Sequence, residues 1–139
     1  MSLLVGKKAP EFSLTAVVNG GEIVKDYSLA QFEGQKYVLL FFYPKDFTSL
    51  CQSELVAFQE QLSEFEARNT AVIACSTDTA DSHAAAARVP QNQGGIEGVT
   101  FPIVSDANKT IATNYDVISG DYEYSEEGLL TSDSEMIAL

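Results

Sequence analysis

The feature that most constrains the fold is a set of three apolar runs spaced along the chain. They read YVLLFFY at 37–43, TAVIACSTD at 70–78 and VTFPIVSD at 99–106. Continuous apolar runs of this kind, rich in β-branched and aromatic residues, are typical of strands buried on both faces. Helix-length stretches separate the runs, and such connections favour parallel strands joined by crossover helices. The sequence therefore predicts a layered α/β fold.

Helical spacing is clearest between residues 52 and 68. Leu55, Phe58, Leu62 and Phe65 recur at steps of three or four residues, so they share one stripe of a helix. The glutamates of this segment lie mostly off that stripe. We therefore expect one long amphipathic helix that packs its apolar stripe against the sheet.

Turn and cap signals predict the remaining elements. Near the N-terminus, apolar-polar alternation before the turn residues 19–22 predicts a short edge strand followed by a second strand. The alanine-rich stretch after residue 80 predicts a helix that Asp81 or Ser82 caps, with His83 exposed at its start. Asp106 is expected to cap a short helix over the sequence ANKTIATNY.

The composition is acidic, with a formal net charge of −12 over 139 residues. Nucleic acid and anionic membranes are not expected as partners, because phosphate binding needs clustered Lys and Arg. No apolar run approaches the roughly 18 residues that span a bilayer, and the N-terminus does not resemble a signal peptide. We expect a cytoplasmic protein with a single domain over 1–139. The stretch 119–139 has no basic residue and is predicted to form a partly mobile acidic loop.

The chain contains two cysteines, Cys51 and Cys75, and one histidine. These are too few for a disulfide scaffold or a zinc ligand set, so no metal site is expected. Free thiols fit a reducing compartment. Cys75 falls in a predicted buried strand, where a packing role is expected. The absence of a CxxC pair argues against a general disulfide reductase of the thioredoxin kind.

Cys51 lies where the apolar run 37–43 gives way to the predicted helix. Ligands and chemistry gather at the carboxyl ends of strands in open α/β sheets. A helix N-terminus also presents unpaired N–H groups and the positive end of the helix dipole, and both favour a thiolate. A nucleophilic role for Cys51 is therefore plausible. Simple packing competes with it, since buried cysteines are common and most are unreactive.

Two neighbours of Cys51 can take part in such chemistry. Thr48, three residues earlier, carries a hydroxyl that could reach a small oxygen-containing substrate above the sulfur. Its competing role is capping of the helix. Pro44 offers an apolar wall without an N–H group that could screen the sulfur from water, although turn geometry alone also explains it.

The spacing of Pro44, Thr48 and Cys51 matches the P-x-x-x-T-x-x-C signature of the peroxiredoxins. The surrounding sequence, FFYPKDFTSLCQSE, resembles the typical two-cysteine branch of that family. This branch includes bacterial alkyl hydroperoxide reductase C subunits. The resemblance extends over APEF near the start, CSTDTADSHAAA, and GGIEGVTFPIVSDANKTIATNYDV. It implies a thioredoxin-like fold, with a central mostly parallel sheet flanked by helices and an N-terminal hairpin. It also implies a thiol peroxidase.

The resemblance assigns roles to four residues. Cys51 would be the peroxidatic cysteine, whose thiolate attacks hydrogen peroxide or an alkyl hydroperoxide and becomes a sulfenic acid. Pro44 and Thr48 would form the pocket, with the Thr48 hydroxyl and the Cys51 backbone N–H as donors to the departing oxygen. Glu54 matches a position that helps orient an arginine, although it could be an ordinary first-turn acid. No flavin, haem or metal cofactor is implied.

The resemblance further implies thioredoxin or a dedicated disulfide reductase as electron donor, and a homodimer or ring oligomer. Two family features are missing. Neither Arg68 nor Arg88 matches the active-site arginine, and no resolving cysteine follows. The segment after Val117 also looks longer than usual. We therefore expect a chain that is truncated at its C-terminus and weakly active. The alternative is a non-catalytic oligomeric scaffold or a holdase-type module.

Overall fold

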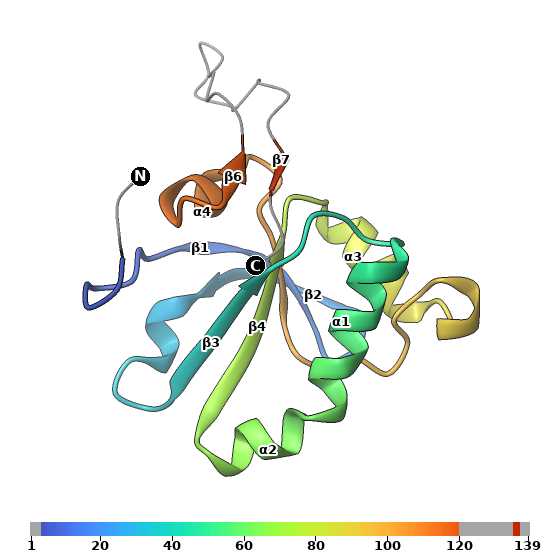
Figure 1. Ribbon diagram of the computed structural model, residues 1–139, viewed down its shortest axis with the longest axis horizontal. Helices are drawn as coiled ribbons and strands as arrows, with labels where there is room; N and C mark the ends of the chain where they lie inside the picture. The colour runs from blue at the N-terminus through green and yellow to red at the C-terminus, as the bar shows by residue number, and fades with distance from the viewer. Residues whose placement is uncertain (1–3, 120–134, 137–139) are drawn as a thin grey trace.

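The fold is built on a five-stranded sheet with the strand order β2-β1-β5-β4-β3 (Figure 1). The computed structural model describes residues 4–119 and 135–136. The strands are β1 (Ser13–Val18), β2 (Glu22–Ser28), β3 (Tyr37–Phe42), β4 (Thr70–Ser76) and β5 (Ile103–Ser105). Two further short strands, β6 (Ile118–Ser119) and β7 (Glu135–Met136), pair with each other outside this sheet.

The sheet is mixed, with a parallel part and an antiparallel part. Strands β3, β4 and β5 run parallel, whereas β1 pairs antiparallel with both β2 and β5. The N-terminal hairpin turns at residues 19–22, as predicted. These pairings confirm the predicted α/β fold with a parallel core and an N-terminal hairpin.

Four α-helices surround the sheet: α1 (Ser49–Glu60), α2 (Leu62–Ala67), α3 (Ala80–Arg88) and α4 (Thr110–Asn114). Two short 3-10 helices, η1 (Leu29–Phe32) and η2 (Gln91–Gln93), complete the helical elements of the described residues. None of the helices in the described part of the chain has the length and apolar character needed to cross a membrane.

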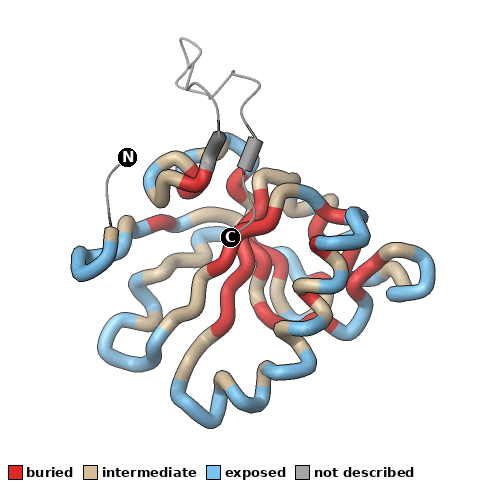
Figure 2. Tube along the Cα trace, viewed as in Figure 1, coloured by how far each residue is buried: buried red, intermediate tan, exposed pale blue. Residues whose placement is uncertain are grey.

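Each face of the sheet has its own apolar core, because successive side chains of a strand point to opposite faces. On one face, Phe41, Ala74 and Ile103 pack with residues of α1 and α3. On the other face, Phe42 and Val104 pack with residues of α4 and the N-terminal hairpin. The buried strand segments converge at the centre of the molecule (Figure 2). Their continuous apolar runs are explained by this double coverage.

The position of one strand differs from the prediction: β1 was expected at an edge, but it lies between β2 and β5. β3 was predicted to be buried on both faces. Phe41 and Phe42 at its end are buried, whereas Tyr37 at its start is 75% exposed, and the strand lies at the edge of the five-stranded sheet. An apolar run reports that both faces of a strand are covered, and it carries no information about lateral neighbours.

The long predicted helix is divided in two. Residues 52–68 were expected to form one helix, whereas α1 begins at Ser49 and a break at Gln61, with φ −100° and ψ 6°, separates α1 from α2. Leu62 and Phe65 still pack against the same core as Leu55. The apolar stripe of the helical segment was therefore predicted correctly, and residues on both sides of the break at Gln61 contribute to the same core.

The predicted caps are partly correct. Thr79, and neither Asp81 nor Ser82, caps α3, and its hydroxyl accepts a hydrogen bond from the Ser82 backbone N–H at 3.2 Å. Asp106 does serve α4, since its carboxylate accepts from the backbone N–H groups of Ile111 at 2.9 Å and the following residue at 2.8 Å. Most of the predicted acidic loop at 119–139 lies outside the described residues.

Candidate active site

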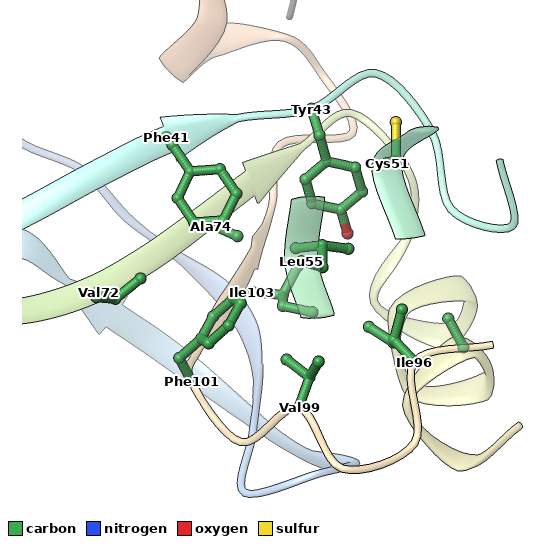
Figure 3. Close-up of a cluster of buried hydrophobic side chains, with 11 residues drawn as sticks. Phe41, Tyr43, Cys51, Leu55, Val72, Ala74, Ile96, Val99, Phe101 and Ile103 are labelled. Carbon is green, nitrogen blue, oxygen red and sulfur yellow. The ribbon is translucent and has the colours of Figure 1, made fainter. Parts of the chain in front are cut away.

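Cys51 is the third residue of α1, the helix that follows the carboxyl end of β3. Its side chain is free and only 4% exposed. It packs in the same core as Tyr43 and Leu55 (Figure 3). The prediction that this thiol lies at a strand-to-helix junction is therefore confirmed. The backbone N–H groups in the first turn of a helix lack partners within the helix, so the end of α1 that carries Cys51 has unpaired hydrogen-bond donors.

Thr48 precedes α1 as its N-cap residue, with extended backbone angles. Its side chain makes no capping hydrogen bond, so the capping role that we considered is wrong. The hydroxyl instead donates to the backbone carbonyl of Lys45 at 3.1 Å. Thr48 itself is exposed, three residues before Cys51.

Pro44 and Glu54 flank this position. Pro44 is half-buried, and its carbonyl accepts a hydrogen bond from the Ser76 hydroxyl at 3.2 Å. Glu54 lies one helical turn after Cys51 and is half-buried, and its carboxylate has no side-chain hydrogen-bond partner among the described residues. The roles predicted for these two residues remain predictions.

Both arginines are bonded to groups outside the loop 44–48 and the first turn of α1. Arg68 forms an ion pair with Glu64 at 2.8 Å, one turn earlier on the same surface. Arg88 donates to the backbone carbonyl of Gly21 at 2.9 Å. Neither guanidinium forms an ion pair with Glu54.

A buried polar cluster beside the site was missed by the sequence analysis. The Asp46 carboxylate accepts from the Tyr43 hydroxyl at 2.7 Å, the Ser82 hydroxyl at 2.8 Å and His83 Nδ1 at 2.7 Å. His83, which was expected to be exposed, is completely buried. We call Tyr43, Asp46, Ser82 and His83 the Asp46 cluster.

The electrostatics of this cluster favour the ionised carboxylate. Burial raises the pKa of Asp46, but hydrogen bonds from His83, Tyr43 and Ser82 outweigh burial, so the pKa falls below its ordinary value of 3.8. Burial and the neighbouring carboxylate both raise the pKa of the Tyr43 phenol well above its ordinary value. Tyr43 is therefore a protonated hydrogen-bond donor at neutral pH.

The second thiol has a different environment. Cys75 lies in β4 with its side chain fully buried, in the core on the sheet face opposite that of Cys51. Burial, together with the carboxylate of Asp106, raises the pKa of this thiol well above its ordinary value. Such a thiol is unreactive, in agreement with the predicted packing role. Within the described residues, no three His, Cys, Asp or Glu side chains are grouped as a metal site.

Comparison with known proteins relates this fold and site to a family. The AhpC/TSA family matches residues 5–137. The chain is 40% identical over 135 residues to a thioredoxin peroxidase of Echinococcus granulosus, with 97% of this chain and 68% of that protein covered. It is 43% identical over 129 residues to peroxiredoxin prdx-2 of Caenorhabditis elegans, with 93% and 63% covered.

A solved structure agrees with these relatives. The reduced 2-Cys peroxiredoxin of Plasmodium vivax superimposes with a TM-score of 0.83 at 33% identity, covering 99% of this chain and 74% of that one. The chain therefore belongs to the AhpC/TSA family, with the thioredoxin-like fold of the peroxiredoxins. By family it is an enzyme of the peroxiredoxin type. It spans 68% and 63% of the length of the two relatives above.

Proposed function

We propose that this chain is a thiol peroxidase that reduces hydrogen peroxide and alkyl hydroperoxides through Cys51. The observation that carries the proposal is the position of Cys51 in the first turn of α1, at the carboxyl end of β3, in a chain of the AhpC/TSA family. Thr48 and Pro44 on the preceding loop support it. The other thiol, Cys75, is completely buried within the sheet and has a raised pKa, whereas Cys51 keeps 4% exposure at the start of α1.

The reaction oxidises one sulfur and reduces one peroxide. The Cys51 thiolate attacks the terminal peroxide oxygen, a sulfur–oxygen bond forms and the O–O bond breaks. The departing oxygen takes the electron pair and a proton and leaves as water or an alcohol, while the sulfur becomes a sulfenic acid. Negative charge grows on the departing oxygen, so donors must converge there. The Cys51 backbone N–H is a suitable donor, and the Thr48 hydroxyl becomes one when it exchanges its hydrogen bond to the Lys45 carbonyl for one to the peroxide.

Regeneration needs a reductant, for which we propose thioredoxin or a dedicated disulfide reductase. We also propose a homodimer or ring and a cytoplasmic location. Repeated turnover by these 139 residues is expected to be slow. Arg68 and Arg88 are engaged elsewhere, and Cys75 cannot act as a resolving thiol because it is buried.

A single-turnover trap tests the proposal. The reduced protein is treated with stoichiometric hydrogen peroxide in the presence of dimedone, and the labelled residue is identified by mass spectrometry. We expect one adduct, on Cys51, in the wild type and in Cys75→Ser, and none in Cys51→Ser. A wild-type protein whose Cys51 stays unlabelled under these conditions would contradict the proposed function.

The alternative function, an oligomeric scaffold or holdase, is favoured by one observation. β3 presents an apolar edge strand in the described sheet, and exposed edges promote association. Protection of an aggregating client protein that is equal in wild type and Cys51→Ser would favour this alternative, because it does not need the thiol.

A further inference from the structure

We propose that Asp46 is a positioning residue for Cys51. In this inference, the Asp46 cluster holds the loop 44–48 in the conformation that presents Thr48 and the first turn of α1 to an incoming peroxide. The inference rests on the proposed function and names a residue that acts on that site without touching the reacting atoms.

The first observation is the contrast between Asp46 and the rest of its loop. Lys45, Phe47 and Thr48 are exposed, whereas Asp46 is 8% exposed and points its carboxylate inward. Three side-chain donors converge on this one carboxylate, each at 2.8 Å or less. An ionised, buried carboxylate with three donors is an anchor, because removing any partner leaves charge poorly compensated.

The second observation is that the loop is anchored through its backbone as well. The Asp46 backbone N–H donates to the Asp78 carboxylate at 2.7 Å. The carbonyl of Pro44 accepts from Ser76 at 3.2 Å, and the Tyr43 backbone N–H donates to the carbonyl of Cys75 at 3.0 Å. The loop is therefore bound to the end of β4 and to the segment that leads into α3.

The third observation is the strained residue that follows. Phe47 has a positive φ of 60°, a conformation that non-glycine residues avoid. Such a conformation persists only where the surroundings determine it. Asp46 is the adjacent residue that is bonded through both backbone and side chain, so it is the group best placed to impose the turn. Thr48 is the next residue after Phe47, and α1 begins at Ser49.

Tyr43 connects the cluster to the sulfur. Its hydroxyl donates to Asp46, while its fully buried ring packs in the core that contains Cys51 and Leu55. Figure 3 shows this ring near the start of α1, where Cys51 lies. Fixing the hydroxyl therefore fixes the ring on which the first turn of α1 rests.

The hydrogen bonding of His83 indicates that this residue is present to hold the Asp46 carboxylate. Carboxylate oxygens only accept hydrogen bonds, so Nδ1 of His83 must be the donor to Asp46. The other ring nitrogen, Nε2, is buried and has no partner among the described residues. A residue present only for packing would avoid the cost of a buried, unpaired nitrogen. We conclude that His83 is required for its Nδ1 donor.

A purely structural role predicts different behaviour from a positioning role. Asp46→Asn keeps the shape of the side chain but replaces one acceptor oxygen by an NH₂ group, so the side chain can no longer accept from Tyr43, Ser82 and His83 together. We expect the rate of Cys51 sulfenic acid formation, measured in single turnover with hydrogen peroxide, to fall by about tenfold to a hundredfold. Alkylation of Cys51 by iodoacetamide, which does not need the oriented donors, should change by less than about threefold. Asp81→Asn, at an exposed position of α3, is the control of equal charge.

A second pair of variants keeps the test decisive if Asp46→Asn does not fold. In His83→Asn the amide NH₂ can replace the Nδ1 donor but the ring is lost, whereas His83→Phe keeps a ring and loses the donor. Positioning predicts that His83→Asn retains most of the peroxide rate and that His83→Phe loses it. The reverse order would show that packing matters, and would overturn the inference.

The remaining outcomes separate this inference from the proposed function. No peroxide reaction of Cys51 in the wild type would contradict the proposed function itself. A reactive wild type with an equally reactive, folded Asp46→Asn would overturn only the positioning role. An equal loss of peroxide reaction and alkylation would also overturn it, because the cluster would then control exposure or ionisation of the thiol in general.

Discussion

At the residue scale, Asp46 combines burial with an ionised side chain. Its pKa is lowered in the folded protein because hydrogen bonds from His83, Tyr43 and Ser82 outweigh the effect of burial. The folded state therefore binds a proton at this carboxylate less readily than the unfolded state does. The resulting stabilisation is fully present above the ordinary pKa of 3.8 and is lost as the pH falls through the lower, folded value.

Asp46→Asn should therefore change stability in a pH-dependent way. We expect a loss of about 2 kcal/mol in the free energy of unfolding at neutral pH, because the amide has one acceptor oxygen where the carboxylate had two and carries no charge. The difference from the wild type should shrink at an acid pH below the ordinary value of 3.8, where the stabilisation by the ionised carboxylate is being lost. Urea unfolding at both pH values measures this. A difference that is independent of pH would show that the charge of Asp46 is not what stabilises the fold.

The residues of the site differ in how far the sequence could reveal them. Pro44, Thr48 and Cys51 lie within one short stretch, so their spacing carried a signal. The Asp46–His83 contact spans 37 positions and leaves no local pattern, and His83 begins an alanine-rich helix that looks solvated. Only the three-dimensional structure shows that α3 turns this side chain inward.

At the scale of elements, the loop between α3 and β5 supports the first turn of α1. Gln52, next to Cys51, donates from its side-chain amide to the carbonyl of Gln91 at 2.7 Å and to that of Gly95 at 2.8 Å. Gly95 is buried against Val89: a Cβ atom at this glycine would lie 2.1 Å from the Val89 carbonyl oxygen. Glycine is therefore required here for close approach of two backbone segments.

Gly95→Ala should destabilise the protein markedly. The added methyl group has no room beside the Val89 backbone, so the loop must shift. We expect a loss of about 3 kcal/mol in the free energy of unfolding, as for overpacked sites. Gln93→Ala, at an exposed position of the same loop, should change it by less than about 0.5 kcal/mol. Equal effects of the two substitutions in chemical denaturation would refute this account.

The elements also show where sequence patterns lose information. Apolar runs located β3, β4 and β5, and the stripe of α1 and α2 was correct. The break at Gln61, the cap at Thr79 and the lateral order of the strands were not predicted. These features depend on how elements pack with one another, and a periodic pattern reports only which sides of an element are covered.

At the scale of the whole molecule, the two edges of the described sheet differ in character. The β2 edge carries Glu22, Lys25 and Asp26, and its pairing with β1 is irregular. Charged residues and irregular pairing of this kind discourage further strands from adding. The β3 edge has the sequence YVLLFF without a charge, a proline or an irregularity. Self-association is therefore expected at β3.

Tyr37→Lys should reduce self-association without harming the core. Tyr37 is 75% exposed at the start of β3, so a charge there should disfavour pairing with a strand of another molecule and have little effect on folding stability. We expect a lower weight-average mass in sedimentation or light scattering at high protein concentration. Ile23→Lys, on the already charged β2 edge, is the matched control and should have no effect. Unchanged association of Tyr37→Lys would show that β3 is not the contact.

The two cores on opposite faces of the sheet also decide how an oxidised Cys51 can be repaired. Cys51 belongs to one core and Cys75 to the other, so the body of the sheet stands between the chain's two thiols. An internal disulfide would require the sheet to be dismantled. If Cys51 is oxidised as proposed, no thiol within these 139 residues can reach it while the sheet is intact, so among them the reduction needs a thiol from another segment or molecule.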